Sequence, residues 1–396
     1  MKLLNSILKI HEELKNIRQT IHTYPELAFE EKKTSELIIH YLNKWDIPMI
    51  RGLAKTGVVG IISNGSSKKS IGLRADMDAL PIQEQNNFKH KSVNNGKMHA
   101  CGHDGHTAML LGAAYYLSKN KNFSGTIYFI FQPAEEGAGG AKIMIEEGLF
   151  DKCQMDAVFG MHNWPGIKKG YMGAIDGCMM ASSNEFELVI NGKGSHAAQP
   201  HLGIDPITVA IQIAQSWQTI ISRIKNPLDA GVLSITQIHS GKSTNVIPDS
   251  AIMIGTVRTF SEKLIDIIEK KMKEISESTA KGFGAKIQFD FKRNYPPLIN
   301  HTKQTKFANE VMNEIVGKKN IITDLQPTMG SEDFAFMLQK KPGCYAFIGN
   351  GDGDHRISGH GLGPCNLHNP SYDFNDEIIP IGSSYWVRLA EKFLSS

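Results

Sequence analysis

The sequence has few cysteines, and it lacks the long apolar and charged runs that mark several classes of protein. Its five cysteines are an odd number in 396 residues, so we expect reduced thiols in a cytoplasmic protein and no disulfide framework. We find no apolar run of about 18 residues, the length that a membrane-spanning helix needs. Charged residues interrupt the apolar positions of residues 1–19, which argues against a signal peptide.

Further absences narrow the expected partners. The net charge is +3, and the basic residues form no long run, so we expect neither a nucleic acid nor a membrane surface as a partner. We also find no internal repeat and no low-complexity segment. Because 41% of the residues are hydrophobic and 21% are charged, the composition is that of a globular protein. The length predicts two domains or one large domain.

Strand-like and helical segments alternate in the first half of the chain. Apolar, β-branched runs at 71–77, 126–131 and 157–162 are separated by helical patterns at 107–116 and 140–148. This order predicts an α/β fold, in which ligands bind beyond the carboxyl ends of the strands. Several polar residues fall at such ends, namely Asp76, Asp78, Glu135, Glu136 and His162.

The pattern changes between residues 182 and 294. Half-exposed strands and two helices follow in the order strand, helix, strand, strand, helix, strand, which predicts a ferredoxin-like βαββαβ unit. Asp205 and Ser261 are suitable N-caps for its helices. We therefore predict a discontinuous first domain, residues 1–181 and 295–396, and an inserted domain, residues 182–294. The half-exposed strands of the inserted domain leave a face or an edge available for a partner.

The segment Met98–Thr107 concentrates side chains that bind divalent metals. It holds Cys101, His103, Asp104 and His106, and thiolate, imidazole and carboxylate are the ligands of first-row metals. Its glycines allow the tight turns that bring such side chains together, and we expect the cluster on a loop that enters a helix. The alternative is a structural zinc knuckle or a polar turn. A structural zinc site would need a second Cys/His pair at short spacing, and we find none.

Two adjacent carboxylates, Glu135 and Glu136, follow an apolar strand and a proline. Neighbouring side chains in an extended segment point in different directions, so one carboxylate can bind a metal while the other faces the attacking water. Metal-assisted hydrolysis needs this division between a Lewis-acidic ion and a base. His162 and His368 add imidazoles. We assign no role to the isolated histidines His11, His40, His90 and His301.

These segments resemble the M20 metallopeptidases, specifically the amidohydrolase branch that contains hippurate hydrolases, N-acyl-amino-acid deacylases and indole-acetyl-amino-acid hydrolases. The resemblance covers essentially the whole chain. The matching motifs are His22-Thr-Tyr-Pro-Glu-Leu, Arg74-Ala-Asp-Met-Asp-Ala-Leu-Pro, Met98-His-Ala-Cys-Gly-His-Asp-Gly-His, Phe131-Gln-Pro-Ala-Glu-Glu-Gly, Gly192-Lys-Gly-Ser-His-Ala-Ala, Asn245-Val-Ile-Pro, Gly330-Ser-Glu-Asp-Phe and Leu367-His-Asn-Pro.

The resemblance implies a mixed-sheet catalytic domain with an inserted lid or dimerisation domain, and a site with two divalent metal ions. By the resemblance Glu135 is the general base, and the ligands are Cys101, His103, Glu136, His162 and His368. Only the resemblance keeps His106 out of this set, since spacing does not exclude it. Asp76 stands at the position of a supporting active-site acid, and Asp78 is the alternative residue that orients a ligand.

The amidohydrolase branch departs from the wider family at two of these positions. The wider family has a histidine ligand where this chain has Asp76, and a bridging aspartate where this chain has Cys101. The resemblance therefore places a thiolate between the two ions, with His103 supplying the missing imidazole. A thiolate favours zinc, whereas carboxylate and imidazole also accept manganese, with cobalt and nickel as further alternatives. The identity of the metal therefore stays open.

The resemblance extends to the inserted domain. His196 matches a histidine that approaches the scissile carbonyl, often from the other subunit of a homodimer, where it would stabilise the oxyanion. Asn245 and Arg258 match polar groups near the substrate carboxylate. The alternative for Arg258 is an ordinary surface residue of a strand.

We predict a metal-dependent hydrolase that cleaves the amide bond of an N-acyl-L-amino acid of the hippurate type. An N-acetyl-diaminopimelate-type deacetylase is the first alternative, and a peptidase is a weaker one. A non-catalytic metal-dependent binding protein is the alternative from another class. The presence of Glu135 together with all the ligand candidates argues against it. The sequence does not identify the acyl group or the amino acid.

Overall fold

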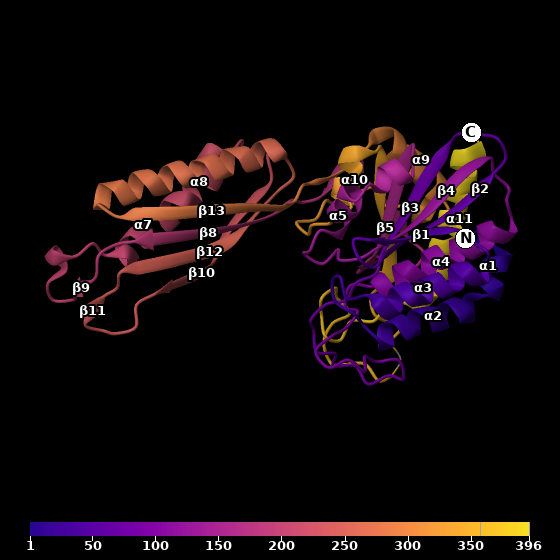
Figure 1. The fold of residues 1–396 in the computed structure, drawn as a ribbon, viewed down its shortest axis with the longest axis horizontal. Helices are drawn as coiled ribbons and strands as arrows, with labels where there is room; N and C mark the ends of the chain where they lie inside the picture. Colours follow the sequence, from indigo (N-terminus) through magenta and orange to yellow (C-terminus); the bar gives the residue numbers. More distant parts are fainter. Residues whose placement is uncertain (357, 396) are drawn as a thin grey trace. The chain divides into compact units, whose positions relative to one another are not determined.

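The computed structural model describes residues 1–356 and 358–395, which form two compact units (Figure 1). Unit 1 consists of Met1–Met179, Ile299–Gln326 and Asp333–Ser396. Unit 2 consists of Met180–Leu298 and Pro327–Glu332. The short segment Pro327–Glu332 thus lies in unit 2, outside the predicted bounds of the inserted domain.

Unit 1 is built on a seven-stranded mixed sheet in the order β1-β2-β4-β3-β5-β15-β6. The central strands β4, β3, β5 and β15 run parallel to one another, while β1, β2 and β6 pair antiparallel with their neighbours. This sheet confirms the predicted α/β class. The strands are β1 (Met49–Leu53), β2 (Gly57–Asn64), β3 (Ser70–Asp76), β4 (Gly125–Gln132), β5 (Ala157–Pro165), β6 (Met172–Gly173) and β15 (Gly343–Gly351).

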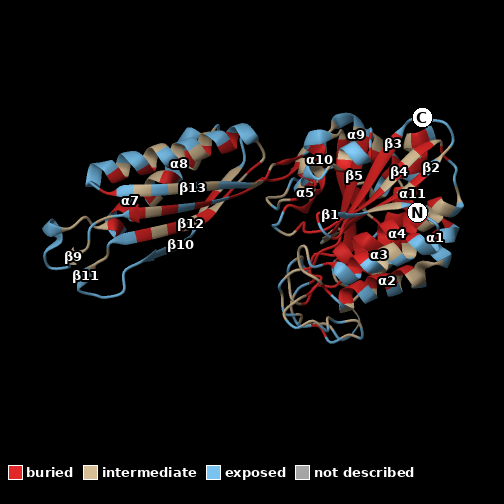
Figure 2. Cartoon of the chain, in the orientation of Figure 1, coloured by how far each residue is buried: buried red, intermediate tan, exposed pale blue. Residues whose placement is uncertain are grey.

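One core cluster of unit 1 lies between one face of this sheet and a layer of helices. Side chains from α2, α3, α4, α9 and α11 pack with apolar residues of the strands in one cluster, and every residue of β3 is buried (Figure 2). The helices of the unit are α1 (Asn5–Lys9), α2 (His11–Thr23), α3 (Lys32–Lys44), α4 (His103–Lys119), α5 (Gly140–Glu146), α6 (Leu149–Lys152), α9 (Thr302–Val316), α10 (Ala335–Lys340) and α11 (Ile379–Ser395).

Two predicted boundaries in unit 1 are corrected by the structure. Helix α4 begins at His103, not near Thr107, so most of the metal-binding cluster forms the first turn of a helix. Gly102 makes this early start possible, because it precedes the helix in the left-handed region with φ of 92°. Strand β5 continues to Pro165, so His162 lies inside the strand and pairs with Phe347 of β15.

Unit 2 contains the predicted ferredoxin-like arrangement. Its antiparallel sheet has the order β10-β12-β8-β13, and α7 and α8 pack on it around the buried side chain of Trp217. Asp205 and Ser261 cap the two helices through hydrogen bonds from backbone N–H groups, as predicted. The elements are β8 (Ser183–Asn191), β9 (Ser195–His196), α7 (Pro206–Thr219), β10 (Gly231–Ser240), β11 (Val246–Ile247), β12 (Ser250–Thr259), α8 (Glu262–Phe283) and β13 (Lys286–Tyr295).

The remaining short elements connect these parts. They are β7 (Gly177–Met180), β14 (Leu298–Asn300), a π-helical turn at Ile220–Ile224 and 3₁₀ turns at Pro200–Leu202, Lys318–Asn320 and Asp376–Ile378. Among the described residues, no helix combines the length and the apolar character required to cross a membrane.

Candidate active site

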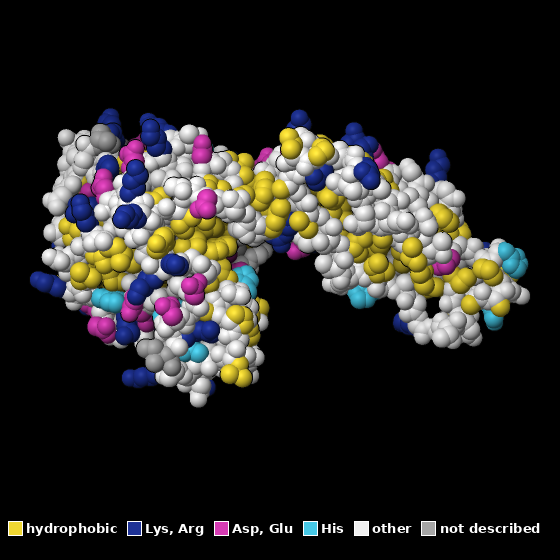
Figure 3. All heavy atoms as spheres, turned by 180° about the vertical axis from the view of Figure 1, so that it is seen from behind, with side chains coloured by type: hydrophobic (Ala, Val, Ile, Leu, Met, Phe, Trp, Pro, Cys, Tyr) yellow, Lys and Arg dark blue, Asp and Glu magenta, His cyan; other side chains and the backbone are white. Residues whose placement is uncertain are grey.

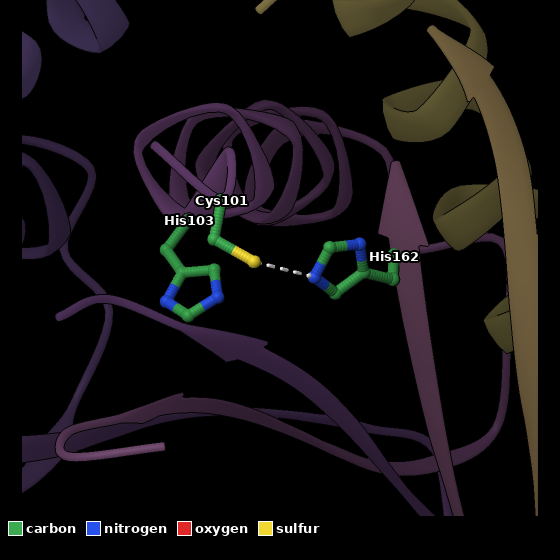
Figure 4. A group of neighbouring side chains, drawn as sticks. All are labelled: Cys101, His103 and His162. Carbon is green, nitrogen blue, oxygen red and sulfur yellow. Dashed lines mark hydrogen bonds between the residues drawn. The ribbon is translucent and has the colours of Figure 1, made fainter. Parts of the chain in front are cut away.

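Three of the predicted ligands meet beside the start of α4 (Figure 4). The thiol of Cys101 lies between the rings of His103 and His162, and its Sγ is 3.3 Å from His162 Nε2. The Nδ1–H of His162 donates to the carbonyl of Asn163 at 2.6 Å. This bond fixes the tautomer of His162 and leaves Nε2 facing the thiol, as a metal ligand requires.

The other two predicted ligands approach the same point. Glu136 Oε1 lies 3.3 Å from His368 Nε2 and 3.9 Å from His103 Nε2. The ligand atoms of Cys101, His103 and His162 lie within 4.8 Å of one another, and so do those of Cys101, Glu136 and His368. The structure therefore brings all five predicted ligands together, with Cys101 common to both groups.

His106 occupies a different place from the five. Its Nδ1 is 2.6 Å from Asp76 Oδ1, and its Nε2 accepts from the backbone N–H of Asn163 at 2.9 Å. Asp76, His103 and His106 also have ligand atoms within 4.8 Å of one another. Because both ring nitrogens of His106 are engaged within the protein, the structure supplies a reason for leaving it out of the ligand set.

The structure separates the surroundings of Asp76 and Asp78. One oxygen of Asp78 lies 3.2 Å from His103 Nδ1, and the other accepts from the backbone N–H of Glu136 at 2.9 Å. Asp78 thus contacts two predicted ligands, which is the position of an orienting residue. Asp76 instead accepts from Arg74 at 2.7 Å and faces His106. Their catalytic roles remain predictions.

Burial and neighbouring charges shift the pKa values of these groups. Burial opposes ionisation of Asp76, but His103 and Arg74 outweigh it and hold the pKa of Asp76 well below its usual value. Burial likewise opposes the charged form of His103, while Asp76 and Asp78 raise its pKa to about 10. Burial lowers the pKa of His162 well below its usual value. His162 is therefore a neutral imidazole, the form that binds metals.

The surroundings of Cys101 favour the neutral thiol over the thiolate. Burial and the nearby carboxylates of Glu136 and Glu135 raise its pKa well above the usual value. A thiolate at this position therefore needs positive charge beside it, and a divalent cation would supply that charge.

Glu135 follows a strained turn. The preceding Ala134 has φ of 58°, and its N–H donates to the buried Glu31 at 2.9 Å. Glu135 is only 6% exposed, and its Oε1 accepts from the backbone N–H of Asp333 at 3.3 Å. Glu135, Glu136 and His103 have carboxylate and imidazole atoms within 4.8 Å of one another, so Glu135 lies beside the ligands.

Arg74 and Asp333 support this edge of the sheet, although neither residue was predicted to have a role. Arg74 donates to Asp76, Gln132 and Asp333, and Asp333 also accepts from the side chain of Gln132. These bonds tie the ends of β3 and β4 to the segment before α10. A signal was present in the sequence, because an arginine inside a largely apolar strand that is expected to be buried needs a buried partner.

The three predicted site residues of unit 2 do not come together. His196 and Asn245 are exposed neighbours on the β9–β11 ribbon, where the N–H of Ala197 donates to the carbonyl of Asn245. Arg258 is half-buried near the other end of β12 and donates to Ser331 at 3.0 Å. The eight residue steps along β12 from Ser250 to Arg258 span roughly 27 Å of strand. Asn245 precedes β12 and Arg258 lies near its far end, and a shared role of the two residues at one substrate carboxylate stays a prediction.

The donor set fits divalent metal ions. It combines a thiol, imidazoles and a carboxylate, which are the side chains that bind zinc and related metals. Two of the donor atoms, His103 Nε2 and Glu136 Oε1, are buried and make no hydrogen bond. Buried polar atoms without partners are costly, and metal ions would satisfy both.

Comparison with known proteins agrees with this chemistry. The model of "Peptidase family M20/M25/M40" matches residues 72–392. The chain belongs to this family. It is 40% identical over 396 residues to the hippurate hydrolase of Campylobacter jejuni, covering 100% of both chains. It is 38% identical over 388 residues to the N-acetyl-L-cysteine deacetylase of Bacillus subtilis, covering 98% of this chain and 89% of the relative.

A solved structure of an M20 protein matches this chain along nearly its whole length. It is a dinuclear metal-binding peptidase of the M20 family from Bacillus subtilis, with a TM-score of 0.83 and 35% identity. The match covers 98% of this chain and 99% of that chain. The predicted M20 resemblance and fold class are thereby confirmed, and this M20 protein is a metal-dependent amidohydrolase.

Proposed function

We propose that this M20 enzyme hydrolyses the amide bond of N-acyl-L-amino acids of the hippurate type, using two divalent metal ions. The observation that carries the proposal is the convergence of the five predicted ligands beside Glu135. Identity of 40% to a hippurate hydrolase along the full length supports the substrate class. The proposed ligands are Cys101, His103, Glu136, His162 and His368.

The residues divide the reaction between them. When bound, the metal ions supply Lewis acidity, which polarises an amide carbonyl and makes a water easier to deprotonate. Glu135 takes the proton of the attacking water and returns it to the leaving amine as a general base and then a general acid. Asp78 holds His103 in its orientation, and Asp76 supports the site through His106 and Arg74. A buried thiolate favours zinc, whereas the carboxylate and imidazole ligands also accept manganese, cobalt or nickel.

Glu135→Gln tests the assignment of the base. The amide keeps the size of the side chain but cannot accept the proton, so turnover of hippurate should fall by roughly 10²- to 10⁴-fold. Metal content, measured by elemental analysis, should stay at the wild-type level. A fully metal-loaded variant that retained more than about a tenth of the wild-type rate would exclude Glu135 as the base.

A panel of N-benzoyl, N-acetyl and indole-acetyl amino acids tests the substrate class. The second candidate function is deacetylation, including the N-acetyl-diaminopimelate type, and the 38% identity to an N-acetyl-L-cysteine deacetylase favours it. Preference for benzoyl over acetyl substrates by kcat/KM would support the hippurate assignment. Preference for N-acetyl substrates would replace the hippurate assignment by deacetylation.

We further propose that unit 2 is a lid and homodimerisation domain and that the enzyme acts in the cytoplasm. The edge strand β10 and the β9–β11 ribbon expose apolar side chains, including Ile238 at 53% and Val246 at 52%. Figure 3 shows hydrophobic side chains spread along the visible face of this unit. An exposed edge is a template for pairing with a second chain. In this proposal the exposed His196 reaches the substrate carbonyl of a partner subunit. The structure describes all five cysteines and joins none of them in a disulfide, consistent with a reducing compartment.

A further inference from the structure

Asn163 follows the predicted ligand His162 in β5 and is completely buried. Its carbonyl accepts from His162 Nδ1 at 2.6 Å. Its side-chain Nδ2 donates to the carbonyl of Cys101 at 2.7 Å. A single asparagine therefore holds the ring of one predicted ligand and the backbone of another.

The same side chain reaches the C-terminal ligand segment. Tyr372, four residues after His368 in the sequence, donates its hydroxyl to Asn163 Oδ1 at 2.7 Å. Burial raises the pKa of Tyr372 well above its usual value, so the hydroxyl keeps its proton. On its other side, Asn163 Nδ2 lies 3.1 Å from His106 Nε2, which already accepts from the Asn163 backbone. This arrangement fixes the amide orientation, with its donors toward two acceptors and its oxygen toward a donor.

The packing around this amide is tight enough to dictate the neighbouring residue. A Cβ added to Gly102 would lie 2.1 Å from Asn163 Nδ2 and 2.6 Å from the Tyr372 hydroxyl. Gly102 separates Cys101 from His103, so the absence of its side chain lets the ligand turn approach the amide. The contacts of Asn163 thus join segments that lie about 60 and 210 residues away in the chain.

We propose that Asn163 is the positioning residue of the metal site, which sets the placement of Cys101, His162 and the His368 segment relative to one another. The proposal rests on the proposed function in one respect, that these residues bind metal. Partners behind metal ligands typically contribute 10- to 100-fold to metal affinity. Asn163 contacts three ligand-bearing segments, so we expect roughly that range for the loss of its side-chain donors.

Asn163→Asp tests this role, because the carboxylate has the shape of the amide but lacks its two donor hydrogens. We expect the metal affinity, measured by competition with a chelator, to fall roughly 10- to 100-fold. The cobalt-loaded variant should show a changed thiolate-to-cobalt absorption band, which reports directly on Cys101. Tyr372→Phe removes the bond to Asn163 Oδ1 and should shift the same band in a smaller degree.

Asn350→Asp is the matched control. Asn350 is equally buried in unit 1, and its amide donates to the carbonyl of Asp373 and accepts from the N–H of Asn375. This control should lose thermal stability but keep the wild-type metal affinity and cobalt spectrum. Equal metal affinity in wild type and Asn163→Asp would overturn the proposal. If Asn163→Asp does not fold, an unchanged cobalt spectrum in Tyr372→Phe would overturn it. Wild-type enzyme that binds metal without cleaving any amide would contradict the proposed function alone.

Discussion

A buried histidine in α2 should make the stability of this protein depend on pH. His22 is fully buried, with Nδ1 2.8 Å from Asp104 and Nε2 3.2 Å from Glu84. Burial lowers the pKa of His22, but hydrogen bonds to these two carboxylates outweigh burial and raise the pKa to about 9, from an ordinary value of 6.5. The imidazolium is therefore stabilised in the folded state by a pair of buried anions.

The sign of the effect follows from this upward shift. Below pH 6.5 His22 is protonated in both the folded and the unfolded chain, so its full contribution to stability is present. As the pH rises through about 9, the folded state loses its proton as well, and the contribution disappears. The difference of about 2.5 pKa units corresponds to about 3 kcal/mol in the free energy of unfolding.

His22→Gln measures this contribution against wild type. Denaturant unfolding of both proteins at pH 6 and pH 10 should give a destabilisation that is about 3 kcal/mol larger at pH 6 than at pH 10. His40→Gln is the control, since His40 is exposed on α3 and its replacement should have little effect at either pH. A destabilisation by His22→Gln that is the same at both pH values would refute the reasoning.

Three further predictions concern the site and the assembly. Cys101→Ser should lower the metal content from about two ions per chain, because a hydroxyl is a poor replacement for a bridging thiolate. Elemental analysis of both proteins checks this prediction. Wild-type protein that saturates at one ion would contradict the two-metal site. Wild type should cleave hippurate better than hippuramide by roughly 10- to 150-fold in kcat/KM, and Arg258→Ala should narrow this preference by slowing the cleavage of hippurate alone. Equal cleavage of hippurate and hippuramide by wild type would exclude recognition of the substrate carboxylate. Wild type should sediment as a dimer at micromolar concentration, and a fully active monomer would exclude a cross-subunit role for His196.

Much of the fold was predictable because periodicity and caps are local signals. The run 126–131 has the apolar composition of a buried strand, and β4 covers it. The order of strands and helices in 182–294 was enough to predict a ferredoxin-like sheet, and Asp205 and Ser261 marked the helix starts. The start of α4 was placed too late, because residues 103–106 carry ligand side chains and a glycine in place of an apolar stripe.

The supporting contacts of the site were beyond sequence patterns, because they join residues far apart in the chain. Nothing near Asn163 in the sequence points to Cys101 or Tyr372, which it contacts through hydrogen bonds. Sequence patterns likewise did not show which histidine faces Asp76 and which faces Asp78. Arg258 and Asn245 are grouped by the resemblance alone, and their shared role at a substrate carboxylate stays a prediction.

The pairing of β5 with β15 has a consequence for synthesis of the protein on the ribosome. Gly343 pairs with Val158, roughly 185 residues earlier in the chain, and all of β8 to β13 is made in between. At about 5–20 residues per second, β5 is without this neighbour for on the order of 10–40 s. During that interval the nascent chain presents an unpaired strand edge of apolar residues, which is a hazard for aggregation. The inserted unit is synthesised during this wait, whereas the proposed metal site cannot be completed until His368 has left the ribosome.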